Sequence, residues 1–565
     1  MRDVSVLIVG AGPTGLTLAC DLLSRGVDVT VLDRQKQFAT TTRALGLQPR
    51  GRQILDRLGA LGDLRTTVPL QSEFDVYLNG QLALHVDLGT LRGRYDDGVL
   101  RVPQTEIERQ LRERLHRLGG EICWGYEVVG VCEEGTSIRA SVRTEEDVQS
   151  VNAKWVVGCE GAHSLIRERI GGHFDGHAFP QTFLLGDVRI DPKCNERPAI
   201  YLRNDQMLAI SALPDRRWRV GVALPSRDPH HPRSSLASTT AEERILPEQI
   251  LAHLQHWFNE IKGDRNTQFY DPSWLSQFHI HRRMSSSLRR GHMLIAGDAA
   301  HLTSPLGGQG MNSGIGDAFN LGWKLALVSQ GKADATLLDT YEEERRSVVD
   351  KLARATTQWT SILLGAGRIN RILRRYILLP MMRLHLVQGW VLSRRPALQE
   401  SYRGSSLAPR WNLINRLIRR GPQPGDIGPD VHCEVLPDYQ LVTLGTLINA
   451  HWALILFGIR EKPAQLCANA AKTLLGTSIR VIRVTTKSHH SAAGYDQIVH
   501  DYRRELTRAY RAGRNTAILL RPDGHLASRS NDRDATTIMR WFDRVPGLHL
   551  PGQSTHRFKE VRSYE

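Results

Sequence analysis

Cysteine is sparse in this 565-residue sequence and is never clustered. No CxxC pair and no His/Cys group at metal-ligand spacing occurs. The cysteines stand singly at Cys20, Cys123, Cys132, Cys159, Cys194, Cys433 and Cys467. This pattern excludes a disulfide-stapled secreted scaffold and a zinc-binding module, so we expect free thiols, no metal site and a cytoplasmic location.

Long apolar runs and blocks of one charge are also missing. No stretch reaches the roughly 18 apolar residues of a membrane-spanning helix, and the first residues run into a strand instead of a signal peptide. The net charge is +15, but 74 Lys and Arg are interspersed with 59 Asp and Glu. We therefore expect no integral membrane protein and no nucleic-acid partner, but a field that favours small anions such as dinucleotides and phenolates.

What is present is an ordinary globular composition, with 41% hydrophobic and 24% charged residues. The length exceeds the roughly 250 to 300 residues at which single cores stop growing, so we expect two or three domains.

A dinucleotide fingerprint stands at the N-terminus. Residues 4–9, VSVLIV, predict a buried parallel strand, residues 14–26 a helix, and residues 27–32 a second strand. The connecting loop, Gly10-Ala11-Gly12-Pro13-Thr14-Gly15, is a GxGxxG that brings a pyrophosphate to a helix N-terminus. Asp33, which Arg34 follows, ends the second strand eighteen residues after Gly15, where a carboxylate holds ribose hydroxyls. The motif alone leaves NAD and FAD open.

Short strand-like runs follow within 73–97 and 176–278, separated by turn residues, and predict an antiparallel sheet inserted into the dinucleotide-binding domain. A strand at 292–297 and a long helix return the chain to that domain. Residues 361–396 read as an apolar, Arg-containing helix, for which we favour core packing over a membrane-surface role. Residues 421–430 predict a linker or loop into a small α/β unit with strands at 452–458, 479–484 and 517–524.

Four segments together resemble the single-component FAD-dependent aromatic hydroxylases, the class that includes p-hydroxybenzoate hydroxylase and phenol hydroxylase. They are the fingerprint, Arg43 in TTRALGLQPRG, CEGAHSLIR at 159–167, and GHMLIAGDAAHLTSPLGGQGMNSGIGDAFNLGWKLA at 291–326. The third segment has Glu160 where the family has Asp.

The resemblance implies FAD-binding roles for further residues. Arg43 would reach the pyrophosphate, Gln104 would lie near the pyrophosphate and isoalloxazine, and the backbone of Val128 would meet the adenine. The remaining cofactor-binding residues implied are Gly161, Gly297, Asp298, Pro305, Gly310, Met311 and Asn312, with Asp298 on the ribityl chain. His301 is more plausible as a fixed structural histidine than as a base.

The implied reaction is that of an NAD(P)H-dependent monooxygenase. A transient NADH or NADPH reduces the flavin, O2 forms a flavin C4a-hydroperoxide, and one oxygen atom is delivered to a phenolic or polycyclic aromatic ring. The catalytic residues stay unassigned, apart from the Pro305 backbone, because the chemistry belongs to the flavin. We place candidate substrate contacts on the inserted sheet at Tyr201, Arg203 and Trp218, with packing or surface roles as the alternative.

The implied fold is α/β: a Rossmann-like FAD-binding domain with an inserted antiparallel substrate sheet, followed by a thioredoxin-like C-terminal domain without CxxC. We expect the FAD-binding domain at 1–72, 98–175 and 279–400, the substrate domain at 73–97 and 176–278, and the thioredoxin-like domain at 401–565. That last domain would serve structure or oligomerisation, which leaves a homodimer open.

Three other functions stay open at this point. The same fold could carry a flavin reductase that hydrogenates double bonds, or a Baeyer-Villiger or epoxidising monooxygenase on a polyketide or antibiotic-like substrate. A FAD-carrying binding or sequestration protein without turnover is the alternative from another class.

Overall fold

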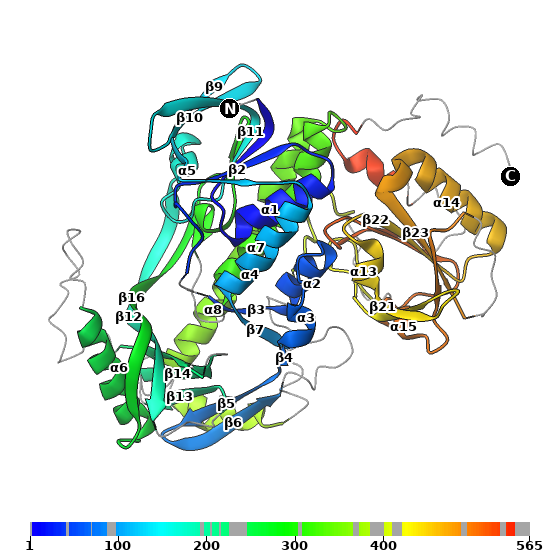
Figure 1. Ribbon diagram of the computed structural model, residues 1–565. Coiled ribbons are helices and arrows are strands. Elements are labelled where there is room, and N and C mark those ends of the chain that lie inside the picture. Colours follow the sequence, from blue (N-terminus) through cyan, green and yellow to red (C-terminus); the bar gives the residue numbers. More distant parts are fainter. Residues whose placement is uncertain are drawn as a thin grey trace.

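Three large sheets organise the molecule in the computed structural model (Figure 1). The structure describes residues 3–40, 44–68, 70–87, 98–191, 197–203, 206–213, 216–224, 246–302, 308–364, 372–384, 400–409, 421–486, 494–530, 538 and 540–548.

The first sheet is the parallel one that the fingerprint predicts. In spatial order its strands are β17 (Arg289–Arg290), β18 (Met293–Ile295), β11 (Val148–Gly158), β1 (Val4–Val9), β2 (Val29–Asp33) and β8 (Ile122–Trp124). The central strand β1 runs parallel to both β2 and β11. Its Val6, Leu7 and Ile8 are fully buried, which is the burial expected of a parallel strand covered on both faces.

Helices and a hairpin complete this unit. The helix α1 (Pro13–Ser24) follows β1 and packs against α7 (Gln309–Ser329) and α4 (Gln104–Arg117). The hairpin of β9 (Glu127–Glu134) and β10 (Ser137–Arg143) extends from β11 by antiparallel pairing. A small sheet of β3 (Leu45–Leu47), β7 (Val99–Pro103) and β4 (Leu70–Gln71) lies beside α2 (Pro49–Arg57) and α3 (Leu64–Thr67).

The second sheet is the inserted one, and all but one of its strand pairs are antiparallel. Its order is β19 (His301–Leu302), β16 (Gln268–Ser285), β12 (Phe174–Asp191), β15 (Trp218–Ala223), β14 (Gln206–Ala212), β13 (Ala199–Arg203), β5 (Glu73–Leu78) and β6 (Gln81–Asp87). The exception is β13 with β5, which run parallel. The long strands β12 and β16 pair with each other and run from the first unit into this sheet (Figure 1).

One face of the second sheet is covered by α6 (Pro247–Lys262), a helix that the strand-like spacing did not predict. Leu254, Trp257 and Phe258 of α6 pack on Val220 and Leu208 of the sheet. The opposite face carries a separate apolar cluster that includes Phe183, Leu202, Met207 and Ala223. Because side chains alternate along a strand, these two clusters are the two sides of the same strands.

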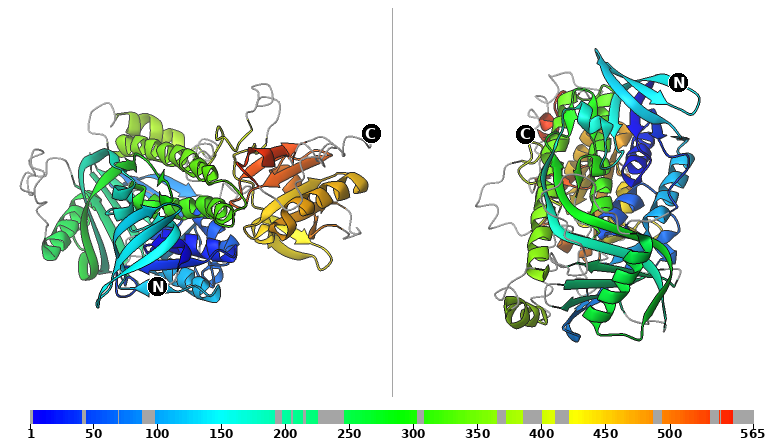
Figure 2. Two further views of the ribbon diagram at one scale, coloured as in Figure 1. Left: turned by 90° about the horizontal axis from the view of Figure 1, so that it is seen from above. Right: turned by 90° about the vertical axis from the view of Figure 1, so that its left-hand side faces the viewer.

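The third sheet belongs to the C-terminal unit, which stands on the opposite side of the molecule from α6 (Figures 1 and 2). Its order is β21 (Gln440–Thr443), β20 (His432–Val435), β24 (Gln497–His500), β23 (Ile479–Thr485), β22 (Trp452–Phe457), β25 (Thr516–Leu520) and β26 (Leu526–Ser530). The central strand β22 is parallel to β23 and antiparallel to β25. The unit's helical segments are α13 (Leu444–Ile448), α14 (Glu461–Leu475), α15 (Glu505–Ala509), and the short 3₁₀ segments η6 (Gly476–Ser478) and η7 (Arg540–Arg544).

The C-terminal unit shares a hydrophobic core with the first unit. Trp323 of α7 and Leu337 of η3 (Ala335–Leu338) belong to the same buried cluster as Trp452 and Trp541. The rings of Trp323 and Trp452 meet edge to face, with 5.4 Å between their centroids. Residues 421–430, predicted as a linker or loop, pack against this unit, since Gly425 and Gly428 hydrogen-bond to Leu526 and Gly524.

The long helix α8 (Asp339–Leu364) ends just inside the segment 361–396, for which we predicted core packing. The described part of that segment forms a π-helical turn at Leu373–Leu378 and the short helix α10 (Leu379–Met382). Tyr376, Met381 and Leu384 are exposed and Met382 is buried against the second sheet, so the prediction of a packed core helix is wrong for most of this part. No helix within the described ranges is long and apolar enough to cross a membrane.

Candidate functional site

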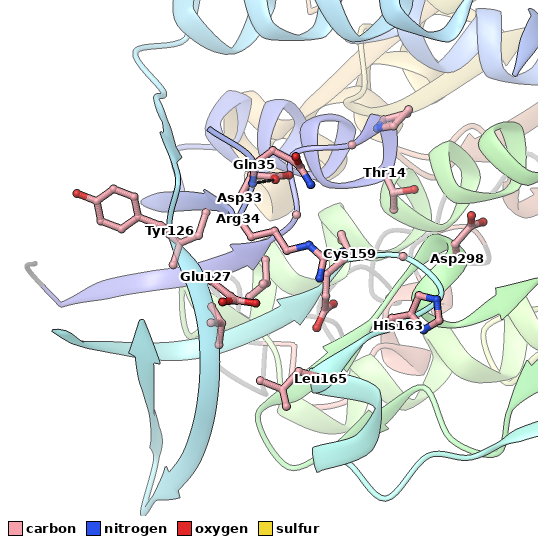
Figure 3. A pocket seen from close by; sticks show the side chains of 18 of the residues that line it. Thr14, Asp33, Arg34, Gln35, Tyr126, Glu127, Cys159, His163, Leu165 and Asp298 are labelled. Carbon is pink, nitrogen blue, oxygen red and sulfur yellow. Dashed lines mark hydrogen bonds between the residues drawn. The ribbon is translucent and has the colours of Figure 1, made fainter. Parts of the chain in front are cut away.

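A cavity of about 630 Å³ opens where β1, β2 and β11 end. The carboxyl ends of parallel strands meet at one edge of a sheet, which is where open α/β sheets bind ligands. Figure 3 shows Asp33 and Arg34 toward one side of this cavity and Asp298 and His163 toward the other. The cavity therefore lies between two walls that come from distant parts of the sequence.

The glycine loop after β1 forms the floor of the cavity. Gly10 has φ +106°, and a Cβ there would lie 2.5 Å from the carbonyl oxygen of Cys159. A Cβ on Gly15 would overlap the carbonyl oxygen of Gly10. Gly12 differs, because its φ of −75° suits any residue and its missing Cβ would meet no described atom within 4 Å. Gly10 and Gly15 are therefore required by the protein's own packing, whereas Gly12 leaves space on the cavity side.

Helix α1 begins at this loop with Pro13 in its first turn and Gly12 as an N-cap that offers no side chain. The first N–H groups of a helix have no acceptor inside it, and the helix dipole adds partial positive charge there. This helix end is thus suited to the anionic pyrophosphate that the sequence predicts.

Asp33 connects the end of β2 to the glycine loop. Its Oδ2 accepts a hydrogen bond from the Ala11 backbone N–H at 2.7 Å, and its Oδ1 accepts one from Gln35 N–H at 2.8 Å. A carboxylate oxygen has two lone pairs, so each oxygen can still accept a ribose hydroxyl.

The opposite wall is built from the segment at 291–326. The 3₁₀ turn η2 (Gly297–Ala299) presents the exposed Asp298, and the first turn of α7 presents Gly310 and Met311. Gly308, with φ +64°, is the N-cap of α7. The N-terminus of α7 therefore lies at the cavity wall.

Most predicted cofactor residues within the described ranges lie on the cavity wall. They are Gly10, Gly12, Pro13, Thr14, Asp33, Arg34, Gln104, Val128, Gly161, Asp298, Gly310 and Met311. Arg43 and Pro305 lie outside the described residues.

Three predicted residues, Gly15, Gly297 and Asn312, stand behind the wall instead of on it. Asn312 Oδ1 accepts the Gln48 N–H at 2.9 Å, while its Nδ2 donates to the Gly308 carbonyl at 2.7 Å. Asn312 thus joins the start of α7 to the segment between β3 and α2. A Cβ on Gly297 would lie 2.5 Å from Thr14 Oγ1, so this glycine lets the η2 turn approach α1.

Glu160 lines the cavity, but its carboxylate is engaged locally. Its Oε1 accepts the Ile166 N–H at 3.0 Å, at the start of α5 (Leu165–Arg169), and burial raises its pKa. Arg167 donates to the Ala299 carbonyl at 3.3 Å and lies over the Phe174 ring. The Glu160 carboxylate therefore accepts a hydrogen bond from the start of α5, and Arg167 connects α5 to η2.

The sequence analysis left other wall residues out of the predicted site. Beyond Glu160, those with side chains of interest are Gln35, Tyr126, Glu127, Arg143, Cys159, His163 and Leu165. Arg143 and Glu127 form a cross-strand ion pair at 3.1 Å between β10 and β9. The sequence signal is the pair of strand-like runs from Glu127 to Arg143, because their pairing sets Arg143 opposite Glu127, next to the predicted Val128.

His301 is buried, as a structural histidine should be, and lies in a charged cluster behind the cavity. Its Nε2 lies 2.6 Å from Asp317 Oδ2, which also accepts the Gly297 N–H at 3.0 Å. Asp317 Oδ1 accepts a hydrogen bond from Arg345 Nε at 2.6 Å. Burial alone would raise the pKa of Asp317, but His301 and Arg345 outweigh it and lower the pKa to about 2. Asp317 thus fixes the η2 turn that carries Asp298.

The predicted substrate contacts lie on the α6 side of the second sheet. Tyr201 and Trp218 are buried in the cluster under α6, where Tyr201 stacks on Tyr77 at 4.7 Å. Arg203 is exposed and donates to the Glu260 carbonyl of α6. All three lie on the α6 side of their strands. Alternation along a strand defines two faces, but it does not predict which face meets the site.

Comparison with known proteins identifies the family. The family described as FAD binding domain matches residues 3–356, which include the whole cavity wall and the second sheet. The chain belongs to this family.

The similar proteins are flavin enzymes. A flavin-dependent monooxygenase of Mycobacteroides abscessus is 30% identical over 80% of the chain and 89% of its own length. A 6-methylpretetramide 4-monooxygenase of Streptomyces rimosus is 35% identical over 63% of the chain, a match that spans 62% of that relative. A solved aromatic hydroxylase from angucycline biosynthesis is 28% identical, with a TM-score of 0.72 over 97% of the chain and 99% of its own.

These findings confirm the predicted resemblance to the FAD-dependent aromatic hydroxylases. They also confirm the predicted class of enzyme, a flavoprotein monooxygenase, for which the cofactor is FAD and the co-substrates are O2 and a nicotinamide donor.

Proposed function

We propose that the chain hydroxylates a flat, largely apolar polycyclic aromatic substrate, using FAD bound in the 630 Å³ cavity. The observation that carries this proposal is the meeting of the Gly10–Gly15 loop and the Asp298–Met311 segment on facing walls of one cavity, although they are nearly three hundred residues apart.

The residues on the walls fit FAD from end to end. Gly12 and the N-terminus of α1 would receive the pyrophosphate, Asp33 the adenosine ribose, and Asp298 the ribityl chain. The N-terminus of α7, with Gly310 and Met311, would face the isoalloxazine. When bound, FAD supplies hydride acceptance and oxygen activation, and a helix N-terminus stabilises the anionic reduced form by about 0.3 to 2 kcal/mol. Arg43 and Pro305 stay predicted contacts.

The substrate wall in this proposal is the face of the second sheet opposite α6. There Phe183 and Phe278 stack with 5.7 Å between ring centroids, in a buried apolar cluster with Leu202, Met207 and Ala223. Aromatic and aliphatic side chains favour contact with a large flat ring system over a small phenolate. The names of two similar proteins, a 6-methylpretetramide 4-monooxygenase and an aromatic hydroxylase from angucycline biosynthesis, support a polycyclic substrate.

We also propose the predicted division of the chain, in which residues 73–97 and 176–278 form the substrate domain and residues 401–565 a thioredoxin-like domain. The order β23-β22-β25-β26, with β23 parallel and β25 antiparallel to β22, supports that likeness. Cys467 is buried on α14 and the sequence has no second cysteine at CxxC spacing, so this domain would not exchange disulfides.

The test is turnover in air with a panel of polycyclic phenols, single-ring phenols and polyketide ketones. We expect NADH or NADPH consumption that a polycyclic phenol accelerates, with one ¹⁸O atom from labelled O2 in an aromatic C–OH product. Labelled oxygen in an ester or epoxide would instead support Baeyer-Villiger insertion or epoxidation. Ligand binding that never accelerates flavin reduction by any member of the panel would contradict turnover.

The matched variant for this test is Asp298→Ala, with the exposed Asp438→Ala as control. Loss of the ribityl contact should give largely colourless, inactive protein, whereas the control keeps its flavin absorbance. Normal FAD content in Asp298→Ala would contradict the placement of FAD in this cavity.

A further inference from the structure

The turn between β25 and β26 inserts a cluster of charges into the interior of the molecule. Arg521, Asp523 and His525 are 2%, 1% and 0% exposed, although they belong to a turn. Such burial is unusual for a connecting segment, which ordinarily lies on the surface. Buried charges of this kind persist only where they are paired and hydrogen-bonded.

The partners of this turn are side chains of α7 and α8. Asp523 Oδ2 accepts hydrogen bonds from Trp323 Nε1 at 3.2 Å and Asn320 Nδ2 at 3.4 Å, both on α7. Arg521 donates to both carboxylate oxygens of Glu344 on α8, at 2.6 and 2.8 Å. Glu344 also accepts from Lys324 Nζ of α7 at 2.8 Å. The turn therefore ties α7 and α8 together.

The same turn also holds α2. The Asp523 carbonyl accepts a hydrogen bond from Arg50 at 2.7 Å. Helix α2 starts directly after Gln48, whose N–H binds Asn312 in the first turn of α7. The C-terminal unit thus contacts both α7 and α2, which the Gln48–Asn312 hydrogen bond joins at the start of α7.

The pairing opposes the effect of burial on the two carboxylates of the cluster, whose pKa values are both lowered. Burial would raise the pKa of Glu344, but Arg521 and Lys324 hold it well below its ordinary value. Burial lowers the pKa of Lys324 to about 8. Removing one charge from this cluster would leave the others unpaired in the interior, so the helices would shift to relieve them.

Helix α7 connects these contacts to the cavity wall. Asn320 stands nine residues after Met311 on the cavity wall, which is about 14 Å along the helix axis. A helix packed along its length moves as a rigid element, so a small shift at Asn320 reaches its N-terminus.

We propose that Arg521 and Asp523 of the C-terminal unit are positioning residues of the flavin site, which set where the N-terminus of α7 faces the isoalloxazine. This rests on the proposed binding of FAD in the cavity. It gives the C-terminal unit a role within its own chain, coupling it to cofactor affinity and reduction potential, in addition to the structural or oligomeric role that the sequence suggests.

The experiment uses the full-length holoenzyme with Asp523→Asn, which keeps the shape and removes the charge opposite Arg521. The control Glu461→Gln breaks an ion pair with Arg483 that stays inside the C-terminal unit. A second variant, Trp323→Phe, keeps an aromatic ring and loses the hydrogen bond to Asp523. We measure the FAD dissociation constant, the flavin reduction potential by anaerobic dye titration, and the melting temperature.

Asp523→Asn should weaken FAD binding at least about fivefold, the lower end of typical coupling between sites, and should make the potential more negative. Trp323→Phe should change both in the same direction and carries the test if Asp523→Asn fails to fold. Glu461→Gln should change neither. Variants that lose thermal stability but keep the wild-type dissociation constant and potential would overturn the inference. A wild-type protein that binds no FAD would overturn the proposed function, and this inference with it.

Discussion

At the scale of single residues, Asp317 connects α7 to α8 and to the η2 turn behind the cavity. It is fully buried and binds Arg345, His301 and the Gly297 N–H at once. We expect Asp317→Asn to lower the free energy of unfolding by about 3 to 5 kcal/mol at pH 7, because it leaves Arg345 without a full counter-charge. Asp339→Asn, which breaks an exposed pair with Arg289, should cost under about 1 kcal/mol.

The pH dependence of this effect has a definite sign. The pKa of Asp317 is lowered in the folded state to about 2, so the stability it contributes is present above its unfolded pKa and is lost as pH falls through about 2. The difference between wild type and Asp317→Asn should therefore be constant from pH 7 to 5 and shrink below pH 4. Denaturant unfolding at each pH measures it, and a difference that grows on acidification would contradict the assignment.

At the scale of elements, the strand-loop-helix of β1 and α1 separates glycines needed by the fold from a glycine needed by a ligand. Gly12→Ala should fold normally, since its Cβ meets no described atom, but should weaken FAD binding by about tenfold or more through contact with the pyrophosphate. Gly15→Ala should instead destabilise the apoprotein, because its Cβ overlaps the Gly10 carbonyl. Apoprotein melting and FAD titration separate the two. Equal FAD affinity in wild type and Gly12→Ala would place the pyrophosphate elsewhere.

These elements also show how far sequence reasoning reaches. The β1 strand, its helix and the segment at 291–326 are predictable, because strand burial, glycine spacing and helix periodicity are local properties. The orientation of Tyr201 and Trp218 is not, since alternation defines two faces without assigning either to the site. The Arg521–Glu344 pair spans 177 residues, and no local pattern in the sequence marks those two residues as partners.

At the scale of the whole molecule, the shared core around Trp323, Trp452 and Trp541 joins the C-terminal unit to the FAD-binding unit. We expect FAD release, tryptophan fluorescence and far-ultraviolet circular dichroism to report one coincident unfolding transition. Trp452→Ala should lower the free energy of unfolding by about 3 to 5 kcal/mol. Leu466→Ala, at an exposed position of α14 in the same unit, should change it by less than about 0.5 kcal/mol. Unfolding of the C-terminal unit under conditions in which FAD stays bound would contradict this single transition.

The turn at Arg521 also bears on how the protein is made. A ribosome adds about 5 to 20 residues per second, so roughly 10 to 35 s separate the synthesis of Glu344 from that of Arg521. During that interval α7 and α8 lack their charged partner, and Trp323 has no Trp452 to cover it until residue 452 is made. Chains that terminate before residue 521 never supply the charged partner of Glu344. Premature stop codons late in the coding sequence should therefore yield aggregated protein and not a shortened, working flavoenzyme.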